Sequence, residues 1–73
     1  MTTVCAPIVA SVWQLHVQAG QEVQAGDTIA VLESMKMEIP VHAPAAGVIS
    51  EVPVVEGQIV QEGDVIVRLD QPS

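Results

Sequence analysis

The chain has almost no aromatic side chains and very few basic ones. Its 73 residues include one Trp, no Phe and no Tyr, and two basic residues, Lys36 and Arg68, stand against nine acidic ones, for a formal net charge of −7 at pH 7. This charge argues against nucleic acid and anionic membrane surfaces as partners, because both are themselves negatively charged. A basic patch on another protein is the more natural partner.

Cysteine and long apolar runs are equally scarce. Cys5 is the only cysteine, so no disulfide forms within the chain, and we expect a cytoplasmic protein in which Cys5 is a small core or edge residue rather than a nucleophile. No apolar run approaches the roughly 20 residues that span a bilayer. The segment 1–10 has neither the basic nor the long apolar region of a signal peptide, so we do not interpret it as one.

The abundant residues are β-branched. The chain has 14 Val and 6 Ile against 3 Leu, with five Gly and five Pro between short apolar runs. β-Branched side chains pack well on pleated sheets, and Gly and Pro mark turns. A chain of this length forms one domain, so we expect a single all-β domain over residues 1–73.

An internal repeat organises the chain. When the sequence is shifted by 37 residues, residues 6–34 align without a gap on residues 43–71, and eleven positions are identical. Two pairs of turn glycines, Gly20/Gly57 and Gly26/Gly63, are among these matches. We interpret the repeat as two copies of one β unit related by a pseudo-two-fold axis.

Each copy predicts four short strands separated by turns. The expected strands are residues 4–6, 11–17, around 23, and 28–33, then residues 39–43, 48–54, around 60, and 65–69. The odd spacing of the apolar residues Val12 and Leu15 predicts a bulge, and Trp13, which aligns with Ser50, is expected at the surface. The predicted fold class is a flattened eight-stranded barrel or sandwich of two pseudo-two-fold-related four-stranded sheets.

The only lysine lies on the connection between the two copies, in the stretch ESMKM at 33–37. The preceding strand is expected to end near Ser34 and the next to begin near Met37, which places Lys36 on an exposed hairpin tip. Met35 and Met37 bury little at such a tip. They are better suited to soft, adaptable contacts with a protein that docks there.

This arrangement resembles the biotin attachment domain of biotin-dependent carboxylases, to which the lipoyl domains of 2-oxo-acid dehydrogenases are closely related. The resemblance rests on the Met-Lys-Met core with Glu33 three residues before the lysine, and it extends over about residues 4–69. Lipoyl domains typically carry Asp where this chain has Met35. The resemblance also has a departure, since family members often have a Pro-Gly pair where this chain has Val9 and Ala10.

The resemblance implies a site and a cofactor. Biotin would be attached covalently to Lys36, and Met35 and Met37 would position this lysine for a biotin protein ligase. Glu33 and Glu38 are candidate ligase contacts, and they are also compatible with simple solvated strand ends. The small filled barrel offers no cleft for a catalytic carboxylate pair, and no metal site is expected, because His16 and His42 have no ligand cluster around them.

The resemblance also implies a role and partners. The chain would be a free-standing, non-catalytic biotin carboxyl carrier protein, monomeric when free. It would take a carboxyl group from a biotin carboxylase to a carboxyltransferase that acts on an acyl-CoA. Two alternatives stay open: a lipoyl carrier for a 2-oxo-acid dehydrogenase-type system that uses the same lysine, and an unmodified barrel that serves as an adaptor module.

Overall fold

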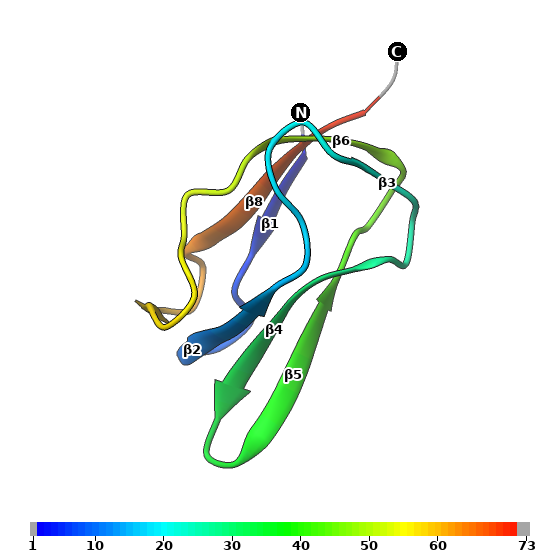
Figure 1. Ribbon diagram of the computed structural model, residues 1–73. Helices are drawn as coiled ribbons and strands as arrows, with labels where there is room; N and C mark the ends of the chain where they lie inside the picture. Colours follow the sequence, from blue (N-terminus) through cyan, green and yellow to red (C-terminus); the bar gives the residue numbers. More distant parts are fainter. Residues whose placement is uncertain (1, 72–73) are drawn as a thin grey trace.

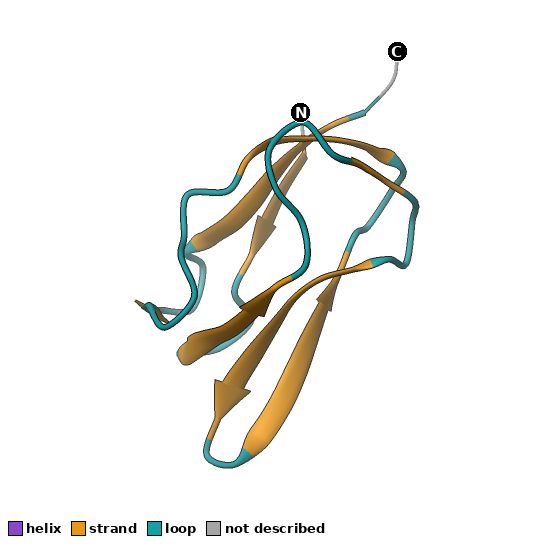
Figure 2. Ribbon diagram, in the orientation of Figure 1, coloured by secondary structure: helices purple, strands orange, loops and turns teal. Residues whose placement is uncertain are grey.

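The computed structural model describes residues 2–71, and every regular element in this range is a β-strand (Figures 1 and 2). The strands are β1 (Thr2–Cys5), β2 (Ala10–Leu15), β3 (Glu22–Val23), β4 (Thr28–Ser34), β5 (Met37–His42), β6 (Gly47–Glu51), β7 (Ile59–Val60) and β8 (Val65–Asp70). The predicted all-β fold class is therefore confirmed.

The strands form two four-stranded antiparallel sheets. One sheet has the order β1-β8-β6-β3 and the other has the order β5-β4-β2-β7. Each sheet contains two strands that precede residue 36 and two that follow it. The predicted flattened barrel of two four-stranded sheets is thus correct, and each sheet draws its strands from both halves of the chain.

Two strands are shorter than the sequence indicated. β2 ends at Leu15 and β6 ends at Glu51, whereas apolar residues continue to Val17 and Val54. Both valines are buried although they lie outside the strands. The apolar pattern therefore indicates burial, and burial continues after strand pairing has stopped. After β6, Pro53 also disfavours further pairing, because proline has no N–H to donate to a neighbouring strand.

The core lies between the two sheets and is entirely apolar within the described residues. Most of its members occur at positions 37 residues apart. These pairs are Ala6/Ala43, Val12/Ile49, Val17/Val54, Val23/Val60, Ile29/Ile66, Ala30/Val67 and Leu32/Leu69. The remaining two buried residues are Ala10 and Val41, and the positions that correspond to them hold Gly47 and the partly buried Val4.

The turns connect the two halves of the chain. The N–H of Gly20 donates to the carbonyl of Ile49 at 2.7 Å, and the N–H of Gly57 donates to the carbonyl of Val12 at 2.7 Å. All four turn glycines have φ near +90°, a conformation that only glycine adopts without strain. Each half of the chain therefore completes the backbone hydrogen bonding of the other half.

The predicted bulge is present in β2. The register of β2 against β4 shifts between Val12 and Gln14, and Trp13 lies at this shift. Its side chain is 45% exposed, so its predicted surface position is confirmed. The corresponding shift in the other sheet lies between Ile49 and Glu51 of β6.

The two ends of the described chain lie together. β1 pairs with β8, with Thr2 opposite Leu69, and the β4–β5 hairpin projects from the opposite end of the molecule (Figure 1). The molecule measures 39 × 19 × 17 Å along its principal axes. Within residues 2–71 there is no helix long and apolar enough to cross a membrane.

Candidate functional site

The β4–β5 hairpin ends in a two-residue turn made of Met35 and Lys36. Ser34 is paired with Met37 directly below this turn, and the ladder continues down to Thr28 opposite His42. Met35 has a φ of 50° and Lys36 a φ of 68°. Two consecutive positive φ angles are those of a type I′ turn, whose twist matches the twist of the strands that it joins. The structure therefore places Lys36 on a tight hairpin tip, as the sequence predicted.

Met and Lys are unfavourable residue types for the backbone conformation of this turn. Type I′ turns favour Asn and Gly at both central positions, because a longer L side chain is crowded at positive φ. Such strain is of the order of 1–3 kcal/mol per residue and persists only where the surroundings enforce it. Here the antiparallel ladder of β4, an inner strand of its sheet, holds the turn in place.

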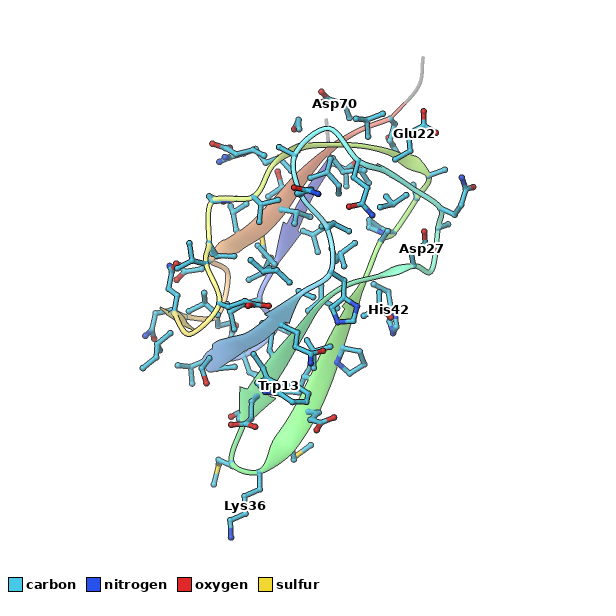
Figure 3. All side chains as sticks on the ribbon, in the orientation of Figure 1. Trp13, Glu22, Asp27, Lys36, His42 and Asp70 are labelled. Atoms are coloured by element: carbon cyan, nitrogen blue, oxygen red, sulfur yellow. The ribbon has the colours of Figure 1, made fainter. Side chains whose placement is uncertain are left out.

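The Lys36 side chain extends away from the body of the molecule (Figure 3). It is exposed and forms no ion pair with any of residues 2–71. The ion pair found among these residues joins Arg68 to Glu51 on the other sheet. Met35 and Met37 are 93% and 63% exposed, so the methionines stand out with the lysine instead of packing on the core. The amine is open to attack an electrophile that is brought to it by another protein.

Glu33 and Glu38 lie on the same hairpin, one pair below Ser34 and Met37. The structure places them directly opposite each other, and both are exposed. The backbone carbonyl of Glu33 accepts a hydrogen bond from the Ser11 hydroxyl at 3.3 Å, which ties this end of β4 to β2. The structure thus brings all five predicted site residues to one end of the molecule.

The other candidates lie elsewhere. The His16 ring is 2.9 Å from the Gln14 side chain, and the His42 ring is 3.5 Å from the Thr28 hydroxyl. No group of three or more His, Cys, Asp or Glu in residues 2–71 is placed to hold a metal ion. Cys5 is exposed on the edge strand β1.

A hollow of about 380 Å³ at the opposite end of the molecule was missed by the sequence analysis. It is lined by β3, the start of β6 and the end of β8, including Glu22 and Asp70. Gly47 forms part of its wall, at the position that corresponds to Ala10 in the first half. The hollow does not reach the Lys36 turn, so it adds nothing to the chemistry of that amine.

A small β domain that presents the exposed amine of its only lysine on a strained tip has the form of a carrier, which delivers a group to other proteins. The sequence matches the biotin/lipoyl family, described as "Biotin-requiring enzyme", over residues 2–69. The chain belongs to this family. The predicted family resemblance is therefore confirmed.

Three curated relatives match over 86% or more of their own length. The chain is 45% identical over 71 residues to a biotin/lipoyl attachment protein of Bacillus subtilis (strain 168), with 97% of each chain covered. It is 51% identical over 61 residues to a biotinylated protein of Mycobacterium leprae (strain TN), with 84% of this chain and 86% of the relative covered. It is 46% identical over 61 residues to the biotin carboxyl carrier protein of acetyl-CoA carboxylase from Solanum lycopersicum, with 84% of this chain and 87% of the relative covered.

Solved structures show the same domain inside larger chains. A single-chain, multi-domain long-chain acyl-CoA carboxylase superposes with a TM-score of 0.92 and 29% identity over 99% of this chain and 7% of its own. The urea carboxylase of Kluyveromyces lactis superposes with a TM-score of 0.87 and 25% identity over 94% of this chain and 6% of its own. Biotin/lipoyl attachment domains are non-catalytic carrier domains, which confirms the predicted carrier class of this chain. The matches to biotin-requiring and biotinylated proteins confirm covalently attached biotin as the predicted cofactor.

Proposed function

We propose that this chain is a biotin carboxyl carrier that is biotinylated on the amine of Lys36. The observation that carries the proposal is the position of this amine, which is exposed at the tip of a two-residue turn and forms no ion pair within residues 2–71. Lys36 is also the only lysine, so no other side-chain amine competes for the modification.

Loading is an acyl transfer to the Lys36 Nζ. The Nζ attacks the carbonyl carbon of an activated biotinyl group, an amide bond forms, the activating group leaves, and one proton is released. The turn supports this reaction because it keeps the amine clear of the sheets, where an enzyme can surround it. The modification removes one of the two positive side-chain charges of the chain.

Biotin, when bound, supplies the chemistry of carboxyl transfer, and the protein supplies delivery. A biotin carboxylase would load the carboxyl group with ATP and bicarbonate, and a carboxyltransferase would pass it to an acyl-CoA. Relatives named as carriers or subunits of acetyl-CoA and acyl-CoA carboxylases support this acceptor class. The lysine and biotin side chains together reach roughly 13 Å by bond counting, and the domain itself would also travel between the two enzymes.

The residues around Lys36 are assigned to recognition by a biotin protein ligase. Met35 and Met37 offer exposed, adaptable thioether contacts, and Glu33 and Glu38 offer two carboxylates side by side. Met35 also favours biotin over lipoate, because lipoyl domains typically carry Asp at this position. We propose further that residues 1–73 form one domain of two copied units, 6–34 and 43–71, and act in the cytoplasm as a monomer.

Co-expression with a biotin protein ligase, or with a lipoate ligase in a parallel culture, tests the proposal by intact mass. The expected result is a gain of one biotin less one water with the first enzyme only, lost in Lys36→Arg. A lipoyl gain alone would make the chain a lipoyl carrier. No gain with either enzyme would indicate an unmodified adaptor, and biotin retained by Lys36→Arg would overturn the site assignment.

A further inference from the structure

The outer face of the β5-β4-β2-β7 sheet carries one apolar residue on each strand, beside a row formed by Glu38, Glu33 and Ser11. Below, "the apolar face" means four residues, one from each strand: Pro40, Val31, Trp13 and Ile59. Val31 pairs with Pro40, and Trp13 and Ile59 are 45% and 68% exposed. In β4, Val31 lies between two fully buried residues, Ala30 and Leu32, so its side chain points to the outside.

The second half of the chain provides a control for this face. The positions that correspond to it, 37 residues away on the outer face of the other sheet, are all polar: Thr3, Arg68, Ser50 and Glu22. There Arg68 pairs with Thr3 in the ladder and forms an ion pair with Glu51. Because the same fold carries polar residues at these positions, folding does not require apolar ones. The apolar face therefore needs an explanation outside the stability of the domain.

The apolar face lies next to the Lys36 turn. Ser11 of β2 pairs with Ile59 on one side and with Glu33 on the other, and Glu33 pairs with Glu38. This row crosses the whole sheet one residue pair below the base of the turn. Figure 3 shows Trp13 in the half of the molecule that contains Lys36. A protein that holds the Lys36 arm can rest on this face at the same time.

The edge of the apolar face is acidic. Glu33 and Glu38 border it near the turn, and the Glu56 carboxylate borders β2, where it accepts a hydrogen bond from the Leu15 N–H at 2.9 Å. A second copy of this chain would bring the same carboxylates and another net charge of −7, which opposes self-association. An apolar centre with an acidic edge instead complements a surface with an apolar centre and a rim of Arg and Lys.

We propose that the apolar face is the docking surface for the biotin carboxylase that loads the carboxyl group, through an apolar patch edged by basic residues. This inference rests on the proposed function, and it names the biotin carboxylase because the carboxylation step is the same for every acceptor, whereas the carboxyltransferase differs with the acceptor. Trp13 and Ile59 are the expected anchors, since a few large buried side chains carry most of the energy of an interface.

The test replaces the anchors with the residues that the other half of the chain carries. Trp13→Ser and Ile59→Glu are combined in the full chain, which is biotinylated and used as the substrate of the biotin carboxylase purified from the same organism. We expect KM to rise at least about ten-fold with kcat unchanged, the loss expected when an interface hot spot is removed. Val48→Ser is the matched control, because Val48 is a 39% exposed apolar residue on the other sheet and its corresponding residue is Ser11; it should leave KM unchanged.

Intact mass and thermal melting precede the kinetics and separate the possible failures. A wild-type chain that takes up no biotin overturns the proposed function, and this inference with it. A loaded wild type whose KM equals that of the folded double variant overturns the docking surface only. Three other outcomes would also overturn the inference. If the double variant loses only loading by the ligase, the face binds the ligase, and if it loses only transfer to the acceptor, the face binds the carboxyltransferase. If it changes only self-association measured by sedimentation, the face binds a second copy of the chain.

A second readout does not depend on folding of the double variant. Trp13 is the only aromatic residue, so 5-fluorotryptophan gives the unbiotinylated wild-type chain a single ¹⁹F resonance at the apolar face. We expect this resonance to shift or broaden when the biotin carboxylase is added. The effect should persist in Val48→Ser and be lost in Ile59→Glu, which changes an exposed residue only. An unchanged wild-type resonance at a saturating concentration of the enzyme contradicts docking at this face.

Discussion

Glu33 and Glu38 face each other directly across the β4–β5 ladder, one pair below the residues that flank the Met35-Lys36 turn. Like charges in directly opposed positions destabilise an antiparallel pair. The end of the molecule that carries the only lysine thus combines a repulsive carboxylate pair with a strained turn. Neither the opposed carboxylates nor the strained turn stabilises the hairpin. Both are expected if this end of the molecule is a site that other proteins recognise.

Glu38→Gln should stabilise the folded chain by a few tenths of a kcal/mol at low ionic strength, because it removes the repulsion from Glu33. The gain should fade in about 1 M NaCl, where the Debye length is about 3 Å. Urea unfolding at both salt concentrations measures it. Glu62→Gln, in the turn before β8, is the control and should give a smaller change; an equal gain there would mean that net charge, and not the opposed pair, is responsible.

Lys36→Arg should fold as the wild type does and take up no biotin, because a guanidinium does not form the amide and the tip buries almost nothing. Thermal melting and intact mass measure the two properties. The double variant Lys36→Arg with Arg68→Lys tests the need for the turn, since it moves the only amine to the outer face of β8. Biotin found on residue 68 would show that the ligase reads any exposed lysine.

Met35→Asp should lower the initial rate of biotin incorporation by the ligase, because it replaces an adaptable thioether next to the reacting amine with a third carboxylate on the hairpin. The rate is followed by mass spectrometry at a limiting ligase concentration. Val55→Asp adds the same charge at a side chain that is 66% exposed and lies outside the hairpin. If both variants load at the wild-type rate, the methionine has no part in recognition.

Met35→Gly should raise the free energy of unfolding by about 1 kcal/mol, because glycine adopts a φ of 50° without steric cost and Met35 is 93% exposed. Urea denaturation measures the change. We expect the same variant to load biotin more slowly, so that stability and loading move in opposite directions. A variant that is both more stable and loaded at the wild-type rate would indicate that the strain serves no purpose in recognition.

Gly47→Ala should destabilise the fold by roughly 1–3 kcal/mol, the usual range for an overpacked site. A Cβ at this position would lie 2.5 Å from the backbone carbonyl oxygen of Asp70, and that backbone is part of β8. For a chain of this size each kcal/mol lowers the melting temperature by about 4–8 °C. A melting temperature within about 2 °C of the wild type, which is half or less of the shift expected for 1 kcal/mol, would mean that the backbone at the end of β8 moves to accommodate the added methyl group at little cost.

Much of the fold was predictable because burial and turn chemistry leave direct traces in the residue types. The turns follow from their glycines, the bulge at Trp13 follows from the odd spacing of the apolar residues Val12 and Leu15, and the tip at Lys36 follows from its place between two expected strands. The ends of β2 and β6 were not predictable, because Val17 and Val54 stay buried after the ladder has ended.

The relation between the strands of the two halves also required the structure. The repeat alone does not say which strands share a sheet, since that depends on hydrogen bonds between residues far apart in the chain, such as the bond from Gly20 to Ile49. The opposition of Glu33 and Glu38, and the apolar face, depend on strand register in the same way. A sequence gives the spacing of such residues along the chain but not the neighbour that each has across a ladder.

The pairing of β1 with β8 has a consequence for how this domain is used in nature. Because the start of β1 and the end of β8 lie at the end of the molecule opposite the β4–β5 hairpin, a polypeptide fused before β1 or after β8 would begin away from the arm. The match accordingly covers 97% of the biotin/lipoyl attachment protein of Bacillus subtilis (strain 168) and about 5% of a pyruvate carboxylase of Aspergillus niger. The length of the barrel separates the start of β1 and the end of β8 from the Lys36 turn. The domain can therefore be joined to other domains while Lys36 stays accessible.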